Sequence, residues 1–233
     1  MKGFIFAAGE GTRLYPVVLE TPKPLITVHK IPVLTYLVEL YLEYQVNDIQ
    51  IIIQEKHEED FRNWKAHFFS EENIDFIIEK KPSGTFGALS KIKSSWFSER
   101  IVVSNGDELK EINIKKMKDW HVQKGGVVTI GLVKVSNPQD YGVVTMDGDR
   151  IIEFIEKPKV PPSNYINSGI YIMEPRIMSY YPPKAKFSML ETDLFPKLVN
   201  KKKLYGYKFK GNWQDTGTFE RWEKAIKTWK RKK

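Results

Sequence analysis

The chain has 233 residues and no cysteine, which excludes disulfide bonds, thiol catalysis and cysteine-bound zinc. With 37 Lys and Arg against 29 Asp and Glu, the formal net charge is +8, a mild excess that is compatible with polyanionic ligands. Part of this excess lies in the runs 201–203 and 230–233, which we expect to be solvated. No aromatic-basic motif or recognition-helix pattern accompanies these runs, so nucleic-acid binding is not predicted.

A hydrophobic content of 41% and a charged content of 28% are those of an ordinary globular protein. No stretch approaches the roughly 20 apolar residues of a membrane span. Met1-Lys2-Gly3 leads directly into a strand-like run, without the pattern of a signal peptide. We therefore expect a cytoplasmic protein with no membrane partner, long enough for one α/β domain with a buried core.

Apolar runs and helical patterns alternate through the first half of the chain. Strands are expected at 3–8, 48–53, 74–79 and 100–104, and helices at 32–44, 58–69 and 85–95. This alternation predicts a mainly parallel sheet with helices on both faces. Ligands on such sheets bind at the carboxyl ends of the strands, where the segments 9–14, 82–87 and 105–108 fall.

The second half changes character. Strands are expected at 127–133, 165–173 and 204–209, helices at 190–201 and 219–230, and a hairpin joining 141–146 to 150–155. The hairpin turn is Asp147-Gly148-Asp149, a strong turn signal. There is no internal repeat and no linker long enough to separate two domains. A single domain over 1–233 is therefore predicted.

The most informative segment is Gly9-Glu10-Gly11-Thr12-Arg13-Leu14, which directly follows the first strand-like run. Glycines in this position leave backbone N–H groups open to an anion, and Arg13 and Lys23 supply positive charge for a polyphosphate. The segment lacks the second glycine and the Lys-Ser/Thr pair of a P-loop. It also lacks the third glycine of a Rossmann dinucleotide site. We interpret it as a triphosphate-binding loop of another kind.

The string G-x-G-T-R-L-x-P from Gly9, followed by Pro22-Lys23-Pro24-Leu25, resembles the signature of the sugar-phosphate nucleotidylyltransferases. Five further strings extend the resemblance across nearly the whole chain; they are PSGTFGA from Pro82, NGD from Asn105, FIEKP from Phe154, NSGIY from Asn167 and WQDTGT from Trp213. The resemblance implies an α/β, Rossmann-like three-layer nucleotidyltransferase fold with a mainly parallel mixed sheet. It also implies an enzyme that joins a nucleoside triphosphate to a sugar 1-phosphate and releases pyrophosphate.

The resemblance assigns a role to each motif residue. Arg13 and Lys23 would be catalytic. Asp107 and Asp215 would hold Mg²⁺, which prefers oxygen ligands. Nucleotide binding would involve Ala8, Gly9, Gly11, Thr12, Glu79, Gly84, Thr85 and Gly87. Sugar-phosphate binding would involve Tyr141, Gly142, Glu156, Lys157, Asn167 and Gly169. Residues 1–125 would thus bind mainly the nucleotide, and residues 126–233 mainly the sugar phosphate.

Some residues depart from the family pattern or need separate comment. Phe86 stands where the family usually has a small residue, which affects how that loop passes the nucleoside, and Ile31 stands where the family often has lysine. The four histidines His29, His57, His67 and His121 form no spacing cluster, so surface or packing roles are expected for them. Trp213 is a candidate to position Asp215. No general base is needed, because the attacking phosphate oxygen is already anionic.

The expected activity is Mg²⁺-dependent transfer of a nucleotidyl group to a mannose-, heptose-, glucose- or amino-sugar 1-phosphate, for glycan or cell-envelope synthesis. Two alternatives stay open. One is a cytidylyltransferase for a non-sugar phosphate such as phosphocholine, against which Glu156 and Lys157 argue. The other is a non-catalytic regulatory subunit that binds nucleotide-sugars, which would be free to lose Lys23 and Asp107. The sequence leaves open the base, the sugar, and whether the protein is a monomer or a homo-oligomer.

Overall fold

The computed structural model describes residues 1–92, 94–182 and 185–231, which divide into two compact units. The first unit comprises Gly3–Lys81, Asn105–Ile112 and Gly211–Lys233, and the second comprises Met1–Lys2, Pro82–Ser104 and Asn113–Lys210. The segments of the two units therefore alternate along the chain. The strands and helices described below confirm the expected α/β fold with a mixed pattern of strand pairing.

Parallel strands form the centre of the first unit. β1 (Lys2–Phe6) pairs with β4 (Ile49–Gln54), which in turn pairs with β5 (Ile74–Glu79), both in parallel. The residues of β4 are buried from Ile49 to Ile53, as expected for a parallel strand covered on both faces. The three strands predicted for this part of the sequence are confirmed.

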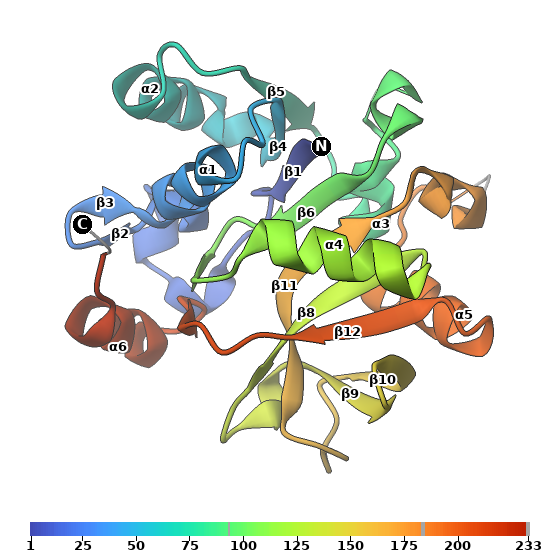
Figure 1. Ribbon diagram of the computed structural model, residues 1–233. Helices are drawn as coiled ribbons and strands as arrows, with labels where there is room; N and C mark the ends of the chain where they lie inside the picture. The colour runs from blue at the N-terminus through green and yellow to red at the C-terminus, as the bar shows by residue number, and fades with distance from the viewer. Residues whose placement is uncertain (93, 183–184, 232–233) are drawn as a thin grey trace. The chain divides into compact units, whose positions relative to one another are not determined.

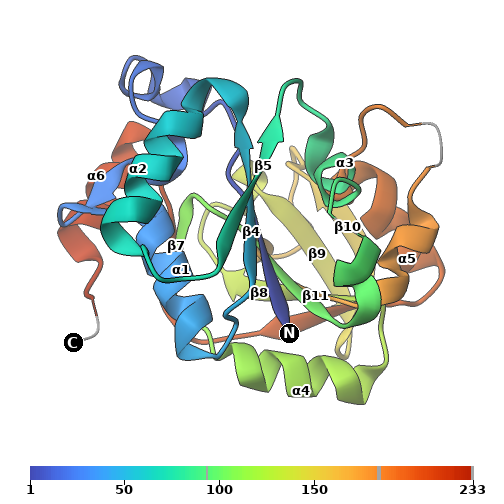
Figure 2. The same cartoon turned by 90° about the horizontal axis from the view of Figure 1, so that it is seen from above.

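Two helices pack together beside these strands. α1 (Val33–Glu43) and α2 (Glu58–Phe68) lie side by side (Figure 2), and a buried hydrogen bond of 2.9 Å runs from Trp64 Nε1 to Thr35 Oγ1. Phe61 of α2 meets the ring of Phe76 on β5 edge-on. Both helices were predicted to within a residue at each end.

Short elements complete the first unit. They are the 3₁₀ turns η1 (Thr12–Leu14), η2 (Val17–Leu19), η3 (Lys23–Leu25) and η4 (Glu55–His57), the β2 (Thr27–Val28) and β3 (Ile31–Pro32) pair, the β7 (Glu108–Lys110) and β13 (Trp213–Asp215) pair, and α6 (Phe219–Thr228). Leu14, Val28, Leu109 and Trp229 meet in one buried cluster. Segments from three distant parts of the sequence thus share one small core.

The strands of the second unit run in the order β6-β11-β8-β12-β10-β9. Their bounds are β6 (Ile101–Asn105), β11 (Tyr165–Met173), β8 (Val128–Lys134), β12 (Leu204–Lys208), β10 (Arg150–Glu156) and β9 (Gly142–Asp147). β8 and β12 are parallel, whereas the other neighbours are antiparallel. The predicted hairpin is confirmed, with Gly148 at φ 59° in its turn.

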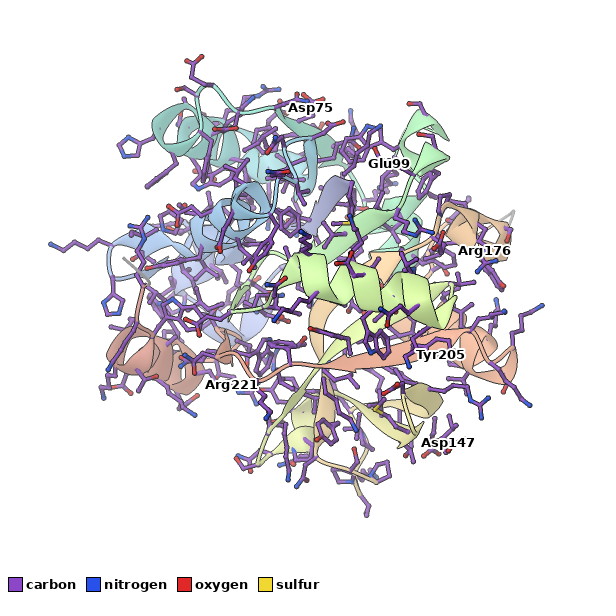
Figure 3. The ribbon with its side chains drawn as sticks, viewed as in Figure 1. Asp75, Glu99, Asp147, Arg176, Tyr205 and Arg221 are labelled. Atoms are coloured by element: carbon purple, nitrogen blue, oxygen red, sulfur yellow. The ribbon has the colours of Figure 1, made fainter. Side chains whose placement is uncertain are left out.

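Helices α4 (Ile114–Lys124) and α5 (Phe195–Asn200) cover opposite faces of these strands. His121 of α4 contacts Thr129 Oγ1 through its Nδ1 at 2.7 Å, whereas Phe195 of α5 packs on Tyr171, whose register partner is Ile130. Thr129 and Ile130 are neighbours on β8, so their side chains point to opposite faces. Figure 1 shows α4 running along β12, the strand on which Tyr205 is labelled in Figure 3.

Two helix predictions need correction. The helix expected over 85–95 is α3 (Gly84–Leu89), followed by the 3₁₀ segment η5 (Ser94–Ser98); Lys93 lies outside the described residues. The helix expected over 190–201 begins as the π-turn η8 (Leu190–Leu194) and becomes α5 only at Phe195. Pro196 lacks the N–H that a continuous α-helix needs at that position.

The remaining short elements of the second unit are the 3₁₀ turns η6 (Pro138–Asp140) and η7 (Pro175–Tyr180). The closing helix expected over 219–230 ends at Thr228, and residues 232–233 of the terminal basic run lie outside the described residues. Within the described part of the chain, every helix is too short or too polar to cross a bilayer.

Candidate active site

The glycine loop follows β1 and turns sharply at Gly11. Gly11 has φ 64°, a left-handed conformation that favours glycine, and a Cβ there would lie 3.0 Å from the Cβ of Lys23. Gly9 faces open space, since a Cβ there would meet nothing within 4 Å. Thr12 and Arg13 are exposed on the turn that follows. The loop thus leaves its backbone and the Arg13 guanidinium accessible.

Gln54, at the end of β4, is hydrogen-bonded to the residue before the glycine loop. Its Nε2 donates a hydrogen bond of 2.6 Å to the carbonyl oxygen of Ala8. Glu79 is the register partner of Gln54 on β5 and is buried. Ala8, Gln54 and Glu79 therefore lie at the carboxyl ends of three parallel strands, where the sequence predicted ligand binding.

Lys23 is a buried lysine paired with a carboxylate. Its side chain is only 10% exposed, and its Nζ donates to Asp107 Oδ2 in an ion pair. Asp107 sits in the turn between β6 and β7. The turn approaches β1 through Gly106, whose N–H donates to the carbonyl of Phe6 at 2.9 Å. A Cβ on Gly106 would lie 3.0 Å from that carbonyl oxygen, so a side chain there would force the turn away from β1.

Asp215 lies near the Asp107 turn but belongs to a different strand, β13. It ends β13, whose antiparallel pairing with β7 sets Asp215 opposite Glu108, the residue after Asp107. The hydroxyl of Thr216 donates to the backbone carbonyl of Asp107 at 2.9 Å. Asp215 Oδ1 accepts the N–H of Gly217 at 2.9 Å and Arg221 Nη1 at 3.3 Å. Arg221 extends from α6, on which it is labelled in Figure 3.

Gly217 marks the point where the predicted residues of the first unit meet. A Cβ at this position would lie 2.7 Å from Asp215 Oδ1, 3.2 Å from Arg13 Nη2 and 3.6 Å from Lys23 Nζ. Arg13, Lys23 and Asp215 are therefore brought together around one glycine, and Asp107 joins them through its ion pair with Lys23. The sequence separation between them gives no hint of this proximity.

Charge interactions set the protonation of this cluster. Burial alone would raise the pKa of Asp107, but the Lys23 ammonium, its hydrogen bond and the charge of Lys110 together hold that pKa below its usual value. Asp107 is therefore anionic at neutral pH. Burial raises the pKa of Glu108, even though Lys110 and Asn105 oppose the shift.

The segment 82–87 in the second unit is tied to the loop before η8. The carbonyl of Ser188 accepts the N–H groups of Phe86 and Gly87 at 2.9 and 3.0 Å. Gly84, at φ 77°, would bring a Cβ within 2.3 Å of the same oxygen. Phe86 is fully buried and packs edge-on against Tyr181, so its bulk is directed into the core rather than along the loop surface.

The hydroxyl of Thr85 makes two hydrogen bonds within the protein. The hydroxyl donates to Glu191 Oε2 and accepts the N–H of Leu190, both at 2.8 Å. Burial raises the pKa of Glu191, although the hydrogen bond from Thr85 opposes the shift, and nearby Glu156 raises it further. Glu191 belongs to none of the sequence motifs, and only its contact with Thr85 in the folded protein reveals it.

Four of the predicted sugar-phosphate residues lie together at the ends of β9 and β10. The N–H of Lys157 donates to the carbonyl of Tyr141 at 3.0 Å, and Lys157 Nζ lies 3.5 Å from Glu156 Oε1. A Cβ on Gly142 would lie 2.9 Å from Glu156 Oε2. Lys157 has φ 47° and a side chain that is 60% exposed, so its ammonium is accessible.

Asn167 and Gly169 shape β11. Asn167 Oδ1 accepts the N–H of Gly169 at 3.0 Å, and its Nδ2 donates to the Tyr171 hydroxyl at 2.9 Å. Gly169 has φ 61°, and the pairing of β11 with β8 is irregular between Asn167 and Tyr171. The glycine of this motif therefore allows a bulge in the strand.

Metal ligation would depend on Asp107 and Asp215. Within the described residues, no three or more histidines or carboxylates are grouped so as to hold a metal ion by themselves. Two carboxylates, one in the turn before β7 and one at the end of its partner β13, nevertheless fit Mg²⁺, which takes one or two carboxylates together with water and substrate phosphates. Asp107 is anionic, because its pKa is lowered.

Comparison with known proteins gives concordant matches. The nucleotidyl transferase family model matches residues 2–232. Mannose-1-phosphate guanyltransferase 2 of Candida glabrata is 34% identical over 225 residues, and mannose-1-phosphate guanylyltransferase of Mycobacterium tuberculosis is 30% identical over 222 residues. Each alignment covers 93% of this chain but 61% of the relative, so the chain spans about three fifths of the length of these curated relatives.

Solved structures match over most of their length. A Bacillus anthracis protein described as a glucose-1-phosphate thymidylyltransferase, solved with sucrose, has a TM-score of 0.88 and 28% identity, covering 97% of this chain and 94% of that one. HddC from Yersinia pseudotuberculosis, solved with GMP-PN, has a TM-score of 0.79 and 27% identity, covering 97% and 98%.

Proposed function

Because the chain belongs to the nucleotidyl transferase family, we propose that it transfers a nucleotidyl group from a nucleoside triphosphate to a sugar 1-phosphate, giving a nucleotide-sugar and pyrophosphate. The observation that carries the proposal is the meeting of Arg13, Lys23 and Asp215 around Gly217, with Asp107 paired to Lys23. Two cations and two carboxylates in one place suit a reaction that assembles several negative charges.

The reaction needs electrostatic help rather than a base. A phosphate oxygen of the sugar 1-phosphate, already anionic, attacks the α-phosphorus of the triphosphate. A bond forms between that oxygen and the α-phosphorus, and the bond from the α-phosphorus to the bridging oxygen breaks, so that pyrophosphate leaves. Arg13 and Lys23 would stabilise the charge that shifts onto the leaving phosphates. The exposed Arg13 and the accessible backbone at Gly9 support a role in binding the triphosphate.

We propose that Asp107 and Asp215 hold a divalent cation, Mg²⁺. When bound, such an ion neutralises phosphate charge and orients phosphate oxygens. Lys23 would keep Asp107 anionic and ready to ligate, and Arg221 and the Gly217 N–H would fix one oxygen of Asp215.

The other assignments are proposals of the same kind. Nucleotide binding would involve Ala8, Gly9, Gly11, Thr12, Glu79, Gly84, Thr85 and Gly87. Sugar-phosphate binding would involve Tyr141, Gly142, Glu156, Lys157, Asn167 and Gly169. Functionally we treat 1–233 as one domain, with 1–125 mainly for the nucleotide and 126–233 mainly for the sugar phosphate. Action in the cytoplasm, on small-molecule substrates without nucleic acid or membrane partners, belongs to the same proposal.

The names of the relatives suggest the substrates to test first. Mannose 1-phosphate with GTP follows from the curated relatives, and glucose 1-phosphate with dTTP follows from the structural match. A pyrophosphate-release screen of five nucleoside triphosphates against mannose, glucose, heptose and amino-sugar 1-phosphates, with Mg²⁺, tests the proposal. We expect release that requires both substrates. Release that depends on the triphosphate alone, or no release from any pair by folded protein, would contradict it.

A further inference from the structure

A buried polar network centred on Glu108 adjoins the two proposed metal-binding carboxylates. Glu108 is 8% exposed, and its neighbour on the same face of β7, Lys110, has a side chain with no exposed surface. Glu108 Oε2 accepts Lys110 Nζ at 3.0 Å and Trp213 Nε1 at 3.2 Å, and its Oε1 accepts Asn105 Nδ2 at 3.0 Å. One carboxylate therefore joins the end of β6, the strand β7 and the strand β13.

Both metal-binding positions are next to this carboxylate. Asp107 precedes Glu108 in the chain, and Asp215 is its register partner across β7 and β13. Each of these strands has only three residues. So short a pair is marginal by its backbone hydrogen bonds alone. The side-chain bonds to Glu108 supply a cross-link between the strands that backbone pairing cannot supply.

Stability by itself does not account for a buried ion pair here. Taking Glu108 and Lys110 out of water costs free energy that their attraction repays only in part, and apolar residues of similar volume would often serve as well. An apolar pair, however, would make no directional hydrogen bonds. Three donors that converge on one carboxylate fix the positions of Asn105, Lys110 and Trp213 relative to it.

We propose that Glu108 is a positioning residue that sets the geometry of Asp107 and Asp215 for a divalent cation, with Lys110 as its counter-ion and Trp213 as its link to β13. The proposal depends on the proposed function, because it assumes that these two aspartates bind the metal. Groups that orient metal ligands typically change metal affinity or activity by 10–100-fold when they are replaced.

Mn²⁺ binding tests this proposal without relying on turnover. Wild-type protein, Glu108→Gln, Lys110→Met and Trp213→Phe are titrated with Mn²⁺ in the presence of GTP, and bound metal is followed by electron paramagnetic resonance. Trp213→Phe keeps an aromatic ring but removes the N–H donor, so it is the variant to compare if Glu108→Gln fails to fold. Asp149→Asn, which disrupts the surface pair with Lys124, is the matched control.

We expect Mn²⁺ to bind the Glu108 and Lys110 variants about 10–100-fold more weakly than wild type, with a smaller loss in Trp213→Phe and none in Asp149→Asn. The Michaelis constant for sugar 1-phosphate should stay unchanged. If folded Glu108→Gln or Trp213→Phe bound Mn²⁺ as wild type does, while Asp107→Asn did not, the positioning role would be wrong and the metal site right. Failure of wild type itself to bind Mn²⁺ would contradict both.

Discussion

Lys23 and Asp107 are a partly buried ion pair, with side chains that are 10% and 27% exposed. Such pairs add little net stability, because desolvation offsets much of the attraction, yet removing one partner leaves an uncompensated charge. The pair is better understood as an ammonium group beside a carboxyl whose pKa it lowers. Each is then available to a ligand of opposite sign, Lys23 to phosphate and Asp107 to a cation.

Replacing Asp107 with Asn tests the metal role at the level of one residue. The amide keeps the shape of the side chain but cannot carry charge, so we expect turnover to fall by about 10²-fold or more. Asp215→Asn should behave alike, and the exposed Asp119→Asn should have wild-type activity. Full turnover by Asp107→Asn in the presence of EDTA would be incompatible with a metal at this site.

Gly217→Ala tests the packing around the same cluster. The added methyl would lie 2.7 Å from Asp215 Oδ1 and 3.2 Å from Arg13 Nη2, so these groups must move. Displacement of reacting groups by about 1 Å costs on the order of 10²-fold in rate, which is the loss we expect. Thermal unfolding of the variant provides the control for folding. Wild-type kcat in Gly217→Ala would show that the cluster is not the reacting centre.

Residue by residue, the sequence predicted the site unevenly. Arg13, Lys23, Asp107 and Asp215 could be named in advance, because each stands in a motif that resembles the signature of the family. Glu108, Glu191 and Arg221 could not. Their importance depends on partners in distant segments, such as Trp213 for Glu108 and Thr85 for Glu191, and no local pattern records such contacts.

Elements with strong periodicity were predictable, and short ones were not. β4, α1 and α2 follow clear strand or helix patterns and appear where expected. β7 and β13 have three residues each, too few for a period to show, and only their pairing with each other defines them as strands. The helix expected from 190 was correct in type over part of its length, but Pro196 divides it.

Glu191 of η8, which accepts the hydroxyl of Thr85 on α3, is expected to make the free energy of unfolding depend on pH. Burial raises the pKa of Glu191 in the folded protein, so the folded state holds this proton more tightly than the unfolded state does. This contribution to stability is present at low pH and is lost as pH rises through the raised pKa. Glu191→Gln keeps an acceptor for Thr85 but cannot titrate. Urea unfolding at a series of pH values should therefore show that the variant does not lose this part of the free energy of unfolding as pH rises.

A matched variant separates this effect from other titrations. Glu153 also accepts a threonine hydroxyl, from Thr145 at 2.9 Å, but it is exposed. Glu153→Gln should leave the pH dependence of the free energy of unfolding unchanged. Parallel pH profiles for wild type and Glu191→Gln would mean that the buried carboxyl does not titrate as described.

At the scale of the whole molecule, the proposed roles follow the two units except at Gly84, Thr85 and Gly87, which are proposed to bind the nucleotide but belong to the second unit. Arg13, Lys23, Asp107 and Asp215 all belong to the first unit, and Tyr141, Glu156, Lys157 and Asn167 all belong to the second. The α/β class could be predicted from alternating patterns. The interleaving of the units could not, because it requires Asn105–Ile112 and Gly211–Lys233 to join the N-terminal segment, which no sequence pattern announces.

Lys157→Ala tests this division of labour. Loss of a charge-assisted phosphate contact, worth roughly 1.5–3 kcal/mol, should raise the Michaelis constant for sugar 1-phosphate about ten- to a hundred-fold. The constant for the nucleoside triphosphate should change little. Lys159→Ala, an exposed lysine two residues on, is the control. A loss confined to the nucleotide titration would mean that Lys157 has been assigned the wrong substrate.

The most direct measurement of the central claim is a ³¹P NMR time course of the purified chain with Mg²⁺, GTP and mannose 1-phosphate, extended to other pairs from the screen. We expect the sugar 1-phosphate signal to be replaced by equal amounts of nucleotide-sugar and pyrophosphate, at a rate that falls sharply in Lys23→Ala. Pyrophosphate formed without nucleotide-sugar, or no new phosphorus signal from any pair with folded protein, would contradict nucleotidyl transfer to a sugar 1-phosphate.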